Sequence, residues 1–585
     1  MDAFSITTGF RALASHVTDY IAEKLSCQAV EGFAGMVSCG GIQGGQRVAT
    51  YAEGSPHEWF LPLSADGPLL WKTAKVGESS LPSVGLVMGM GFGNGSPMPQ
   101  QTGQWDIYVN DRLAVSVRVV KHSQLWRTEE CSLAFAAHRI ESAEPWGSLH
   151  LSDVLTSESF AAFGPAMLIV PRQWLTAGRP AVIRVEANAR EPSTRWLQIT
   201  SQSRILSDSD MFDLVEVALG RRPSVYGKNV YFGDIHSHSG QVRDEHSGGC
   251  GTGTREENYN YALGPAGIDF YCLSDHEGQV APDRIEEFFA LADRYNTDGR
   301  FACLRGFEFT SLVYGHRNIY FRGAGGTIIN ASKDWNTLTF DPDRATTPAE
   351  LWAALEALNE PFLSVPHHTS TTSHPFNWDM FNPRHERLAE VYSCWGSSMY
   401  YGDIPRGISD RYRNLDVRDA LAHRCRVGFI ASGDGHDGQP GNAQSPLSKH
   451  FFRHGGSGWA AAICDNLTRE NIFDALYARR CYATTGVPIG LSVQLNGAPM
   501  GSEMPALARN VRPVLQISCN GCNGIDHLRI VKNGQVVCTH WAHGQWRAEL
   551  EWSDEAYTPG EPCYYYVRAV QVDRESAWSS PIWVG

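Results

Sequence analysis

The sequence predicts an α/β chain in which a central domain of alternating strands and helices lies between two β-sandwich domains. Three observations lead to this prediction. Residues 100–205 show two-residue apolar alternation without a helical pattern of comparable strength, residues 226–486 mix short apolar runs with helical segments, and residues 487–585 are again strand-like. Strands that alternate with helices are typical of a parallel sheet or a β/α barrel. We therefore expect domains over residues 1–225, 226–486 and 487–585.

The N-terminal domain is expected to be a sandwich because its apolar residues recur with a period of two. Leu113, Val115, Val117 and Val119 alternate with smaller or polar residues, and residues 182–186 form a second alternating run. This period is typical of a strand with one buried face. The pattern is weaker over the first 60 residues.

Three helices are predicted in the central domain. Residues 283–296 place apolar side chains on one helical face. Residues 347–350 form a capping box with Pro at the first helical position, and Thr468 begins a third helix. At the C-terminal end, residues 563–572 are rich in Tyr and Val, which favour strands. A small β-sandwich fits the last domain.

The charge balance bears on binding partners. Lys and Arg number 49 and Asp and Glu number 63, which gives a net charge of −14. A general nucleic-acid binder needs a basic face to neutralise phosphates, so this balance argues against that class.

The chain is expected to be cytoplasmic. No apolar run reaches the roughly 18 residues that a membrane span needs, so we expect no membrane association. The first 16 residues lack the basic and apolar regions of a secretory signal, and the 14 Cys are scattered through the chain. Disulfide frameworks belong mainly to short secreted domains.

Side chains that bind metals recur at the ends of short apolar runs in the central domain. Seven such runs can be aligned, and six carry these side chains at or just beyond their C-terminal end. His316 departs from the pattern because it opens a run. The side chains concerned are His236, His238, Asp275, His276, Glu308, His367, His368, Glu390, Asp434 and His436.

The placement of these side chains predicts a metal centre. In a β/α barrel, residues at the C-terminal ends of several strands meet at one face. His236 and His238 are two residues apart on a strand, so their rings point to one side. Glu308 offers a carboxylate that can bridge two cations. Imidazole and carboxylate ligands suit Zn, Mn or Fe, and the set contains no obvious Cys ligand.

Five motifs in this region resemble those of the PHP superfamily, which is named for polymerase and histidinol phosphatase. In chain order they are FGDIHSHSG, CLSDHEG, RGFEFTS, VPHHTS and ASGDGHDGQPG, within residues 228–480. The flanking sandwiches resemble a large bacterial branch of that superfamily. The resemblance implies a distorted seven-stranded β/α barrel that binds two or three divalent metal ions (Mn, Zn or Fe).

The resemblance also implies how the ligands divide among the ions. The first ion would be held by His236, His238, Glu308 and Asp434, and Glu308 would bridge to a second ion held with His316 and His367. A third ion would use Asp244, His276 and His436. Several members have His where this chain has Asp244, and Glu245 and His246 compete with it. His368 likewise competes with His367.

The activity implied by the resemblance is hydrolysis of a phosphate ester by a metal-bound hydroxide. Arg317 would bind a phosphoryl oxygen, with Arg305, Arg243 and Lys449 as weaker choices. His368 would protonate the leaving group, and Asp275 would orient a ligand. Glu390 would be either such an orienting partner or a structural residue.

The substrate is expected to be a small organic phosphate ester. No Arg cluster lies near the motifs, which favours a phosphodiester over a monoester dianion. Two alternatives stay open. One is an amidohydrolase-like enzyme that cleaves a C–N or C–O bond at the same metal site. The other is a non-catalytic binding protein with a vestigial barrel. The sequence does not decide the oligomeric state, and a homo-oligomer is one option.

Overall fold

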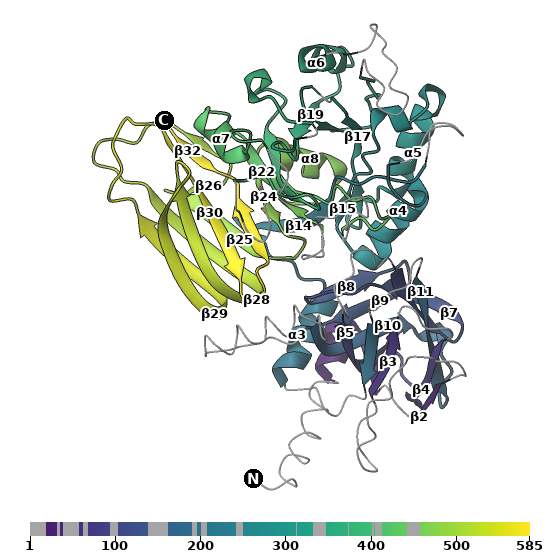
Figure 1. Cartoon of the computed structure of the whole chain (residues 1–585). Coiled ribbons are helices and arrows are strands. Elements are labelled where there is room, and N and C mark those ends of the chain that lie inside the picture. Colours follow the sequence, from purple (N-terminus) through teal and green to yellow (C-terminus); the bar gives the residue numbers. More distant parts are fainter. Residues whose placement is uncertain are drawn as a thin grey trace. The chain divides into compact units, whose positions relative to one another are not determined.

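The computed structural model describes most of the chain (Figure 1). The described residues are 19–31, 35–38, 58–62, 68–93, 103–137, 162–189, 196–200, 208–241, 250–311, 313–331, 345, 347–372, 374–400, 403, 412–441 and 457–585. They form two compact units. Unit 1 comprises the described residues within Met1–Ile140, His150–Arg221 and Gly264–Gly267, and unit 2 comprises those within Arg222–Leu263 and Ile268–Gly585.

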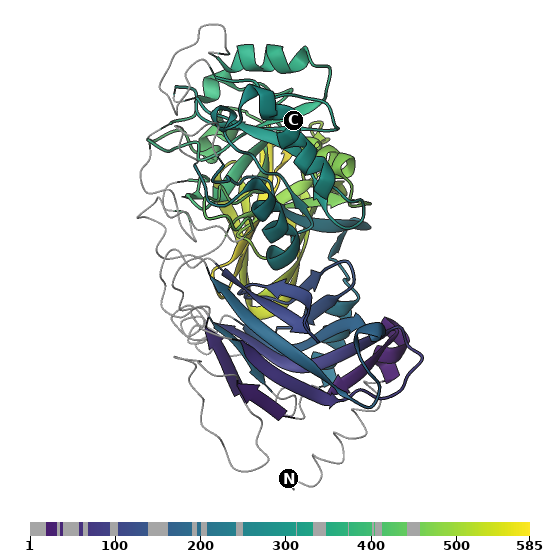
Figure 2. The same ribbon diagram turned by 90° about the vertical axis from the view of Figure 1, so that its right-hand side faces the viewer.

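Unit 1 is built from two sheets with a shared core (Figure 2). The larger sheet has the order β3-β12-β5-β10-β9-β8, with β1 paired to β5, and the smaller has the order β2-β4-β11-β6-β7. Trp71 of the smaller sheet and Leu86 of the larger one belong to the same buried apolar cluster. Helix α3 (Asp208–Ala218) packs on the larger sheet through Leu214 and Val215. The strands are β1 Cys27–Glu31, β2 Gly35–Ser38, β3 Glu58–Pro62, β4 Leu69–Lys75, β5 Ser83–Gly93, β6 Gly103–Val109, β7 Arg112–Val117, β8 Gln124–Arg127, β9 Ser132–Phe135, β10 Ala162–Pro171, β11 Pro180–Ala189 and β12 Trp196–Thr200, and a 3-10 helix, η1, spans Arg172–Trp174.

One predicted strand differs in its alternation. The pairing of β6 with β7 contains a register shift between Ile107 and Tyr108. As a result Leu113 is 51% exposed, whereas Val115 and Val117 are buried as expected. The prediction that Leu113 faces the core was wrong because a bulge changes the side on which a residue points.

Unit 2 contains three sheets. The largest has the order β16-β15-β14-β23-β24-β31-β30-β28-β25-β26, with β13, β27, β29 and β32 attached to it. The other two are β17-β18-β19 and β21-β20-β22. The strands are β13 Ser224–Val225, β14 Lys228–Asp234, β15 Phe270–Tyr271, β16 Ala302–Cys303, β17 Arg305–Phe309, β18 Arg317–Phe321, β19 Phe362–Pro366, β20 Leu388–Ser393, β21 Gly396–Ser397, β22 Gly428–Ala431, β23 Trp459–Cys464, β24 Cys481–Thr484, β25 Gly490–Leu495, β26 Ala498–Pro499, β27 Glu503–Met504, β28 Val514–Lys532, β29 Gln535–Ser553, β30 Cys563–Gln571, β31 Ser576–Ser579 and β32 Ile582–Val584.

The helices of unit 2 follow the predicted signals. Helix α5 spans Ile285–Tyr295, and α6 (Pro348–Glu356) has the predicted capping box. Thr468 caps α8 (Arg469–Tyr477), so all three predicted helices are confirmed. The others are α4 Arg255–Tyr261, α7 Val417–Ala422 and the 3-10 helices η4 Glu277–Gln279, η5 Pro282–Arg284 and η6 Trp378–Met380, while a π-helical segment, η3, spans Ala262–Ala266. No helix in the described part of the chain is long and apolar enough to cross a membrane.

Backbone bridges join the ends of these sheets near the motif residues. Ser237, which follows β14, bridges Gly435, which follows β22, and His276 bridges Glu308. Strands β14, β15 and β16 pair in parallel, as do β20 and β22. The C-terminal ends of several strands are thus brought together, while the seven-stranded barrel stays a prediction. The expected boundary at residue 487 falls within a continuous sheet, since β24 pairs with β31.

Candidate metal centre

Seven segments of unit 2 bring their polar side chains into three adjoining clusters. The clusters are His236, His238 and Asp434; Glu308, His316, His367 and His368; and His238, Cys250, His276 and His436. In each cluster, one potential ligand atom per residue lies within 4.8 Å of the others. All of these residues are buried except Cys250, which is partly buried. Together the described residues supply the donor types that divalent transition metals prefer.

The first cluster contains three of the four residues expected for the first ion, and the fourth, Glu308, belongs to the second cluster. His236 Nε2 and His238 Nε2 lie 3.3 Å and 3.4 Å from Asp434 Oδ1. Asp434 adopts a positive φ of 49°. This backbone conformation is uncommon for residues other than Gly and concentrates at functional sites.

The second cluster contains the expected Glu308, His316 and His367, and it adds His368. His316 Nδ1 and His367 Nε2 lie 2.6 Å and 2.9 Å from Glu308 Oε1. His368 also has a positive φ, of 32°. The rings of both His367 and His368 thus lie in this cluster.

Glu308 lies between the first two clusters. Its Oε1 atom contacts His316 and His367, whereas its Oε2 atom lies 3.2 Å from His236 Nε2 and 3.1 Å from His238 Nε2. Each carboxylate oxygen thus faces a different pair of imidazoles. This is the arrangement that a carboxylate bridging two cations requires.

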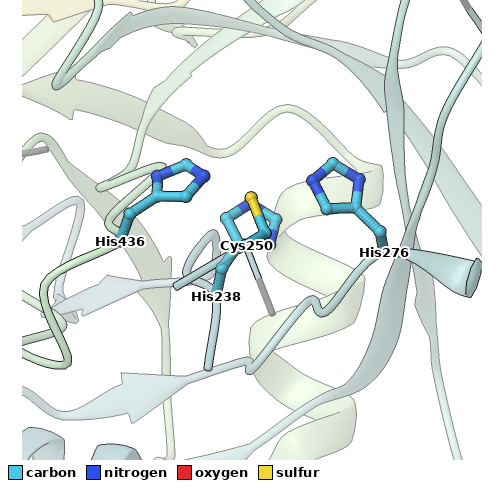
Figure 3. Close-up of side chains that lie close together, drawn as sticks. All are labelled: His238, Cys250, His276 and His436. Carbon is cyan, nitrogen blue, oxygen red and sulfur yellow. The ribbon is translucent and has the colours of Figure 1, made fainter. Parts of the chain in front are cut away.

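The third cluster differs from the expected ligand set. Figure 3 shows the sulfur of Cys250 among the rings of His238, His276 and His436. Asp244, Glu245 and His246 lie outside the described residues. The expectation that the site lacks a Cys ligand was therefore incomplete, because Cys250 stands in a Gly-rich segment that carries no strand or helix pattern.

Partner groups fix the orientation of several rings. Glu390 Oε2 lies 3.0 Å from His236 Nδ1. Of the two roles expected for Glu390, orienting a ligand or a structural role, this contact favours the first. His436 Nδ1 lies 2.9 Å from the Asp434 carbonyl oxygen, and His276 Nδ1 lies 2.6 Å from Thr310 Oγ1. A carbonyl can only accept, so His436 carries its proton on Nδ1 and offers its Nε2 lone pair. Such contacts are typical of metal-binding histidines.

Several buried polar atoms of the clusters lack a hydrogen-bond partner among the described residues. They include His238 Nδ1, His316 Nε2, His367 Nδ1, His368 Nδ1 and Asp434 Oδ2. Leaving one buried polar atom unsatisfied costs about 1–3 kcal/mol. The concentration of such atoms in one place indicates that the residues fit bound cations.

Burial and neighbouring charges shift the pKa values of the side chains in the clusters, some upward and some downward. Burial lowers the pKa of His367 and of His436 to about 4, so both imidazoles are in the neutral, metal-binding form at pH 7. Burial acts to raise the pKa of Glu308, but the surrounding histidines hold it well below its usual range. Burial raises the pKa of Glu390 to about 7.

Asp234 and Asp275 hold the ligand-bearing segments in place. Asp234 accepts hydrogen bonds from the backbone N–H groups of His236, Gly433 and Gly441. A Cβ atom at Gly433 would lie 2.5 Å from Asp234 Oδ2, so this close approach requires Gly.

Asp275 accepts from the Ser239 backbone at 2.7 Å, from Ser239 Oγ at 2.8 Å and from Arg255 Nε at 2.9 Å. It therefore positions the segment that follows His238, while the expected contact with a ligand side chain is absent from its described hydrogen bonds.

Arg317 does not join the clusters. Its Nε atom donates to Glu386 Oε1 at 2.8 Å, and its Nη1 atom donates to the carbonyls of Tyr314 and Gly315. The side chain is fully buried and lies over the ring of Phe376. This environment is that of a buried ion pair, which argues against the phosphate-binding role expected from the sequence.

The structure also adds aromatic neighbours that sequence reasoning missed. His374 stacks on His316 with a centroid distance of 4.1 Å and lies 4.6 Å from His368. The ring of Trp395 lies 5.5 Å from that of His368, measured between centroids. His374 follows the VPHHTS motif in a loop, where no periodicity could single it out.

The chain is similar to a protein family and to bacterial proteins that are described as uncharacterized. A family model described as a protein of unknown function, DUF3604, matches residues 268–393. An uncharacterized protein of Chlamydia pneumoniae is 28% identical over 380 residues, which is 61% of this chain and 57% of the relative. One from Chlamydia trachomatis serovar D is 26% identical over 386 residues, with the same coverage. The chain thus spans little more than half the length of these relatives.

Two solved structures show weak similarity to this chain. A two-domain protein from Bacteroides vulgatus containing a predicted PHP-like metal-dependent phosphoesterase has a TM-score of 0.30 and 12% identity, covering 62% of this chain and 97% of its own. PsfC from Pseudomonas syringae has a TM-score of 0.25 and 15% identity, covering 40% of this chain and 82% of its own. Neither likeness assigns a substrate to the clusters.

Proposed function

We propose that this protein is a metal-dependent phosphoesterase of the PHP type, and that it prefers a phosphodiester. The observation that carries the proposal is the position of Glu308, whose two oxygens face two different histidine pairs. The five ordered motifs and the adjoining third cluster support the same assignment.

Divalent cations at these positions would activate water and screen the charge on the phosphoryl oxygens. His236, His238, Glu308 and Asp434 would hold the first, and Glu308, His316, His367 and His368 the second. The role of the chain is to aim the imidazoles at one centre and to keep several of them, such as His367 and His436, neutral at pH 7. At His236 and His238 the neighbouring carboxylates outweigh burial and raise the pKa, so a cation bound there would displace a proton. The low pKa values of His367 and His436 and the contact of Glu390 with His236 serve this purpose.

The cationic side chains near the motifs favour a substrate of low charge. Arg317 is paired with Glu386, Arg255 with Asp275 and Arg305 with Asp293. Arg243 and Lys449 lie outside the described residues. Because each of these three arginines is paired with a carboxylate, few of these cations would remain, beyond the metals, for a monoester dianion. A diester monoanion needs fewer of them.

The structure bears on the expected proton donor as well. His368 is buried, and burial lowers its pKa well below its usual value. A neutral imidazole is suited to bind a metal, whereas a general acid must carry a proton. These observations favour a ligand role for His368, and protonation of the leaving group by this residue stays a prediction.

A substrate screen tests the proposal. The full chain is loaded with Mn, Zn or Fe and assayed with bis-(p-nitrophenyl) phosphate, p-nitrophenyl phosphate and a p-nitrophenyl amide. We expect the highest kcat/KM for the diester, and loss of turnover in both His238→Ala and Asp434→Asn. A preference for the monoester would overturn the diester assignment, and cleavage of the amide alone would favour the amidohydrolase-like alternative. No turnover in any metal form would favour a binding protein.

A further inference from the structure

Cys250 belongs to the third cluster, and hydrogen bonds of the residues that follow it fix its segment on two sides. Gly251 N–H donates to the Ser239 carbonyl at 3.0 Å, and the Gly253 carbonyl accepts from Gly240 N–H at 2.7 Å. The segment is thus tied on one side to the residues that directly follow His238.

The other side of the segment is tied to His436. Thr252 Oγ1 donates to the His436 carbonyl at 2.8 Å. A Cβ atom at position 251 would lie 2.0 Å from the His238 carbonyl oxygen, so this approach is open only to Gly. The sequence GGCGTGT at residues 248–254 supplies that residue next to the thiol. The backbone is therefore built to bring the sulfur to the histidines.

The third cluster has enough ligand atoms for an ion of its own. His238 Nε2 faces Glu308 Oε2 at 3.1 Å and Asp434 Oδ1 at 3.4 Å, which places its ligand atom with the first cluster. A neutral imidazole has one free lone pair, so it serves one ion at a time. Cys250, His276 and His436 then remain as three ligands, and three protein ligands with one open position is the arrangement of catalytic zinc sites.

We propose that Cys250 binds a metal ion as a thiolate and makes the third position a zinc-selective site with His276 and His436. Forming the sulfur–metal bond releases the thiol proton to the solvent. A thiolate is a soft ligand that favours Zn²⁺, whereas Mn²⁺ favours oxygen. The inference rests on the proposed metal centre, but it concerns binding and does not depend on which ester is cleaved.

Cobalt substitution tests the proposal without an activity assay. The full chain is stripped of metal, loaded with Co²⁺ and compared with Cys250→Ser and with the matched control Cys522→Ser, which alters a cysteine outside the three clusters. We expect wild type and Cys522→Ser to develop the near-ultraviolet sulfur-to-cobalt charge-transfer band. Cys250→Ser should lack it and bind one equivalent less metal.

Selectivity gives a second readout. With Mn²⁺ in excess and Zn²⁺ limiting, we expect the third position of wild type to bind Zn²⁺ in preference to Mn²⁺. The Cys250→Ser variant should lose this preference. Wild type that binds three cobalt ions without the band would overturn the proposal, even if the variant failed to fold. A band that persists in Cys250→Ser would overturn it as well. A band without phosphoesterase activity would leave the site standing and remove only the proposed function.

Discussion

Replacing Glu390 is expected to weaken the first metal position without altering any ligand. Glu390 Oε2 lies 3.0 Å from His236 Nδ1, and both side chains are buried. With a cation bound, the Glu390 carboxylate would accept the Nδ1 proton, which leaves the lone pair of His236 Nε2 for the metal. This Nε2 atom lies 3.2 Å from Glu308 Oε2 and 3.3 Å from Asp434 Oδ1. Loss of this contact leaves the ring free to change tautomer or rotate.

Two estimates of the magnitude agree. A hydrogen bond to a charged group contributes about 1.5–3 kcal/mol, and loss of a partner that orients a metal-binding histidine typically costs 10–100-fold in metal affinity. The second range corresponds to about 1.4–2.8 kcal/mol. Glu390→Gln keeps an acceptor oxygen and removes only the charge, so we expect a loss of about tenfold. Glu390→Leu removes the acceptor, and a loss of about a hundredfold is expected.

The assay is a competition titration of the metal-free protein with Zn²⁺ against a chromophoric chelator at pH 8. At this pH the Glu390 carboxyl, whose pKa burial raises to about 7, is largely ionised in wild type. Glu356→Gln is the matched control, because Glu356 Oε1 lies 2.7 Å from His385 Nε2 in a similar pair outside the clusters. If both Glu390 variants bound Zn²⁺ as tightly as wild type and Glu356→Gln, the orienting role would be refuted.

Three further predictions follow from buried charges. The purified protein should hold at least two equivalents of divalent transition metal, and Glu308→Gln should lose both; less than one equivalent by elemental analysis, unrestored by Mn or Zn, would contradict this. Arg317→Leu should lower the free energy of unfolding by about 3–5 kcal/mol, because it leaves the buried Glu386 unpaired. Adding Glu386→Leu should restore part of this free energy. If the single variant were as stable to denaturant as wild type, the result would support a role of Arg317 in substrate binding instead. Burial lowers the pKa of His122 to about 4, below the value of about 6.5 in an unfolded chain. The unfolded state therefore takes up a proton first as the pH falls, so this group destabilises unit 1 between these pH values, by up to about 3 kcal/mol. Thermal unfolding at pH 7 and at pH 5 should show that His122→Asn loses less stability between the two pH values than wild type does. An equal loss of stability in both proteins would assign the effect to other groups.

The candidate site was largely predictable because its ligands stand where strands end. His236, His238, Glu308 and Asp434 each belong to a short motif, and their order along the chain matches the order of the strands. Helices were predictable for a similar reason, since the capping signal of α6 is contained within four residues. The ligand residues and the helices could both be predicted from short stretches of sequence.

Arg317 shows where local reasoning failed. It was assigned to phosphate because it follows His316 and carries a positive charge. Adjacent residues of a strand point to opposite faces of the sheet, however. His316 faces Glu308 of the second cluster, and Arg317 accordingly reaches Glu386 instead. The two-residue period of a strand therefore already indicates that Arg317 points away from the cluster that His316 joins.

Long-range pairing could not be predicted from the sequence alone. Cys250 reaches the histidines because Gly251 and Thr252 bond to segments near positions 239 and 436, which no local pattern reveals. The pairing of β24 with β31 likewise joins the central strands to the last ones across the expected boundary at residue 487. In both places the decisive partner is far away in the sequence.

The buried carboxylates of unit 2 fall into two groups with different consequences for the fold. Asp234 and Asp275 receive hydrogen bonds from backbone and side-chain donors, so their burial is compensated within the protein. Glu308 and Asp434 instead face imidazoles. Burial keeps two of these, His367 and His436, neutral at pH 7, whereas His236 and His238 have raised pKa values because the carboxylates outweigh burial there. A buried charge without compensation is strongly unfavourable. Cations are therefore the natural counter-charges of the second group, and their binding free energy adds to the stability of the folded state.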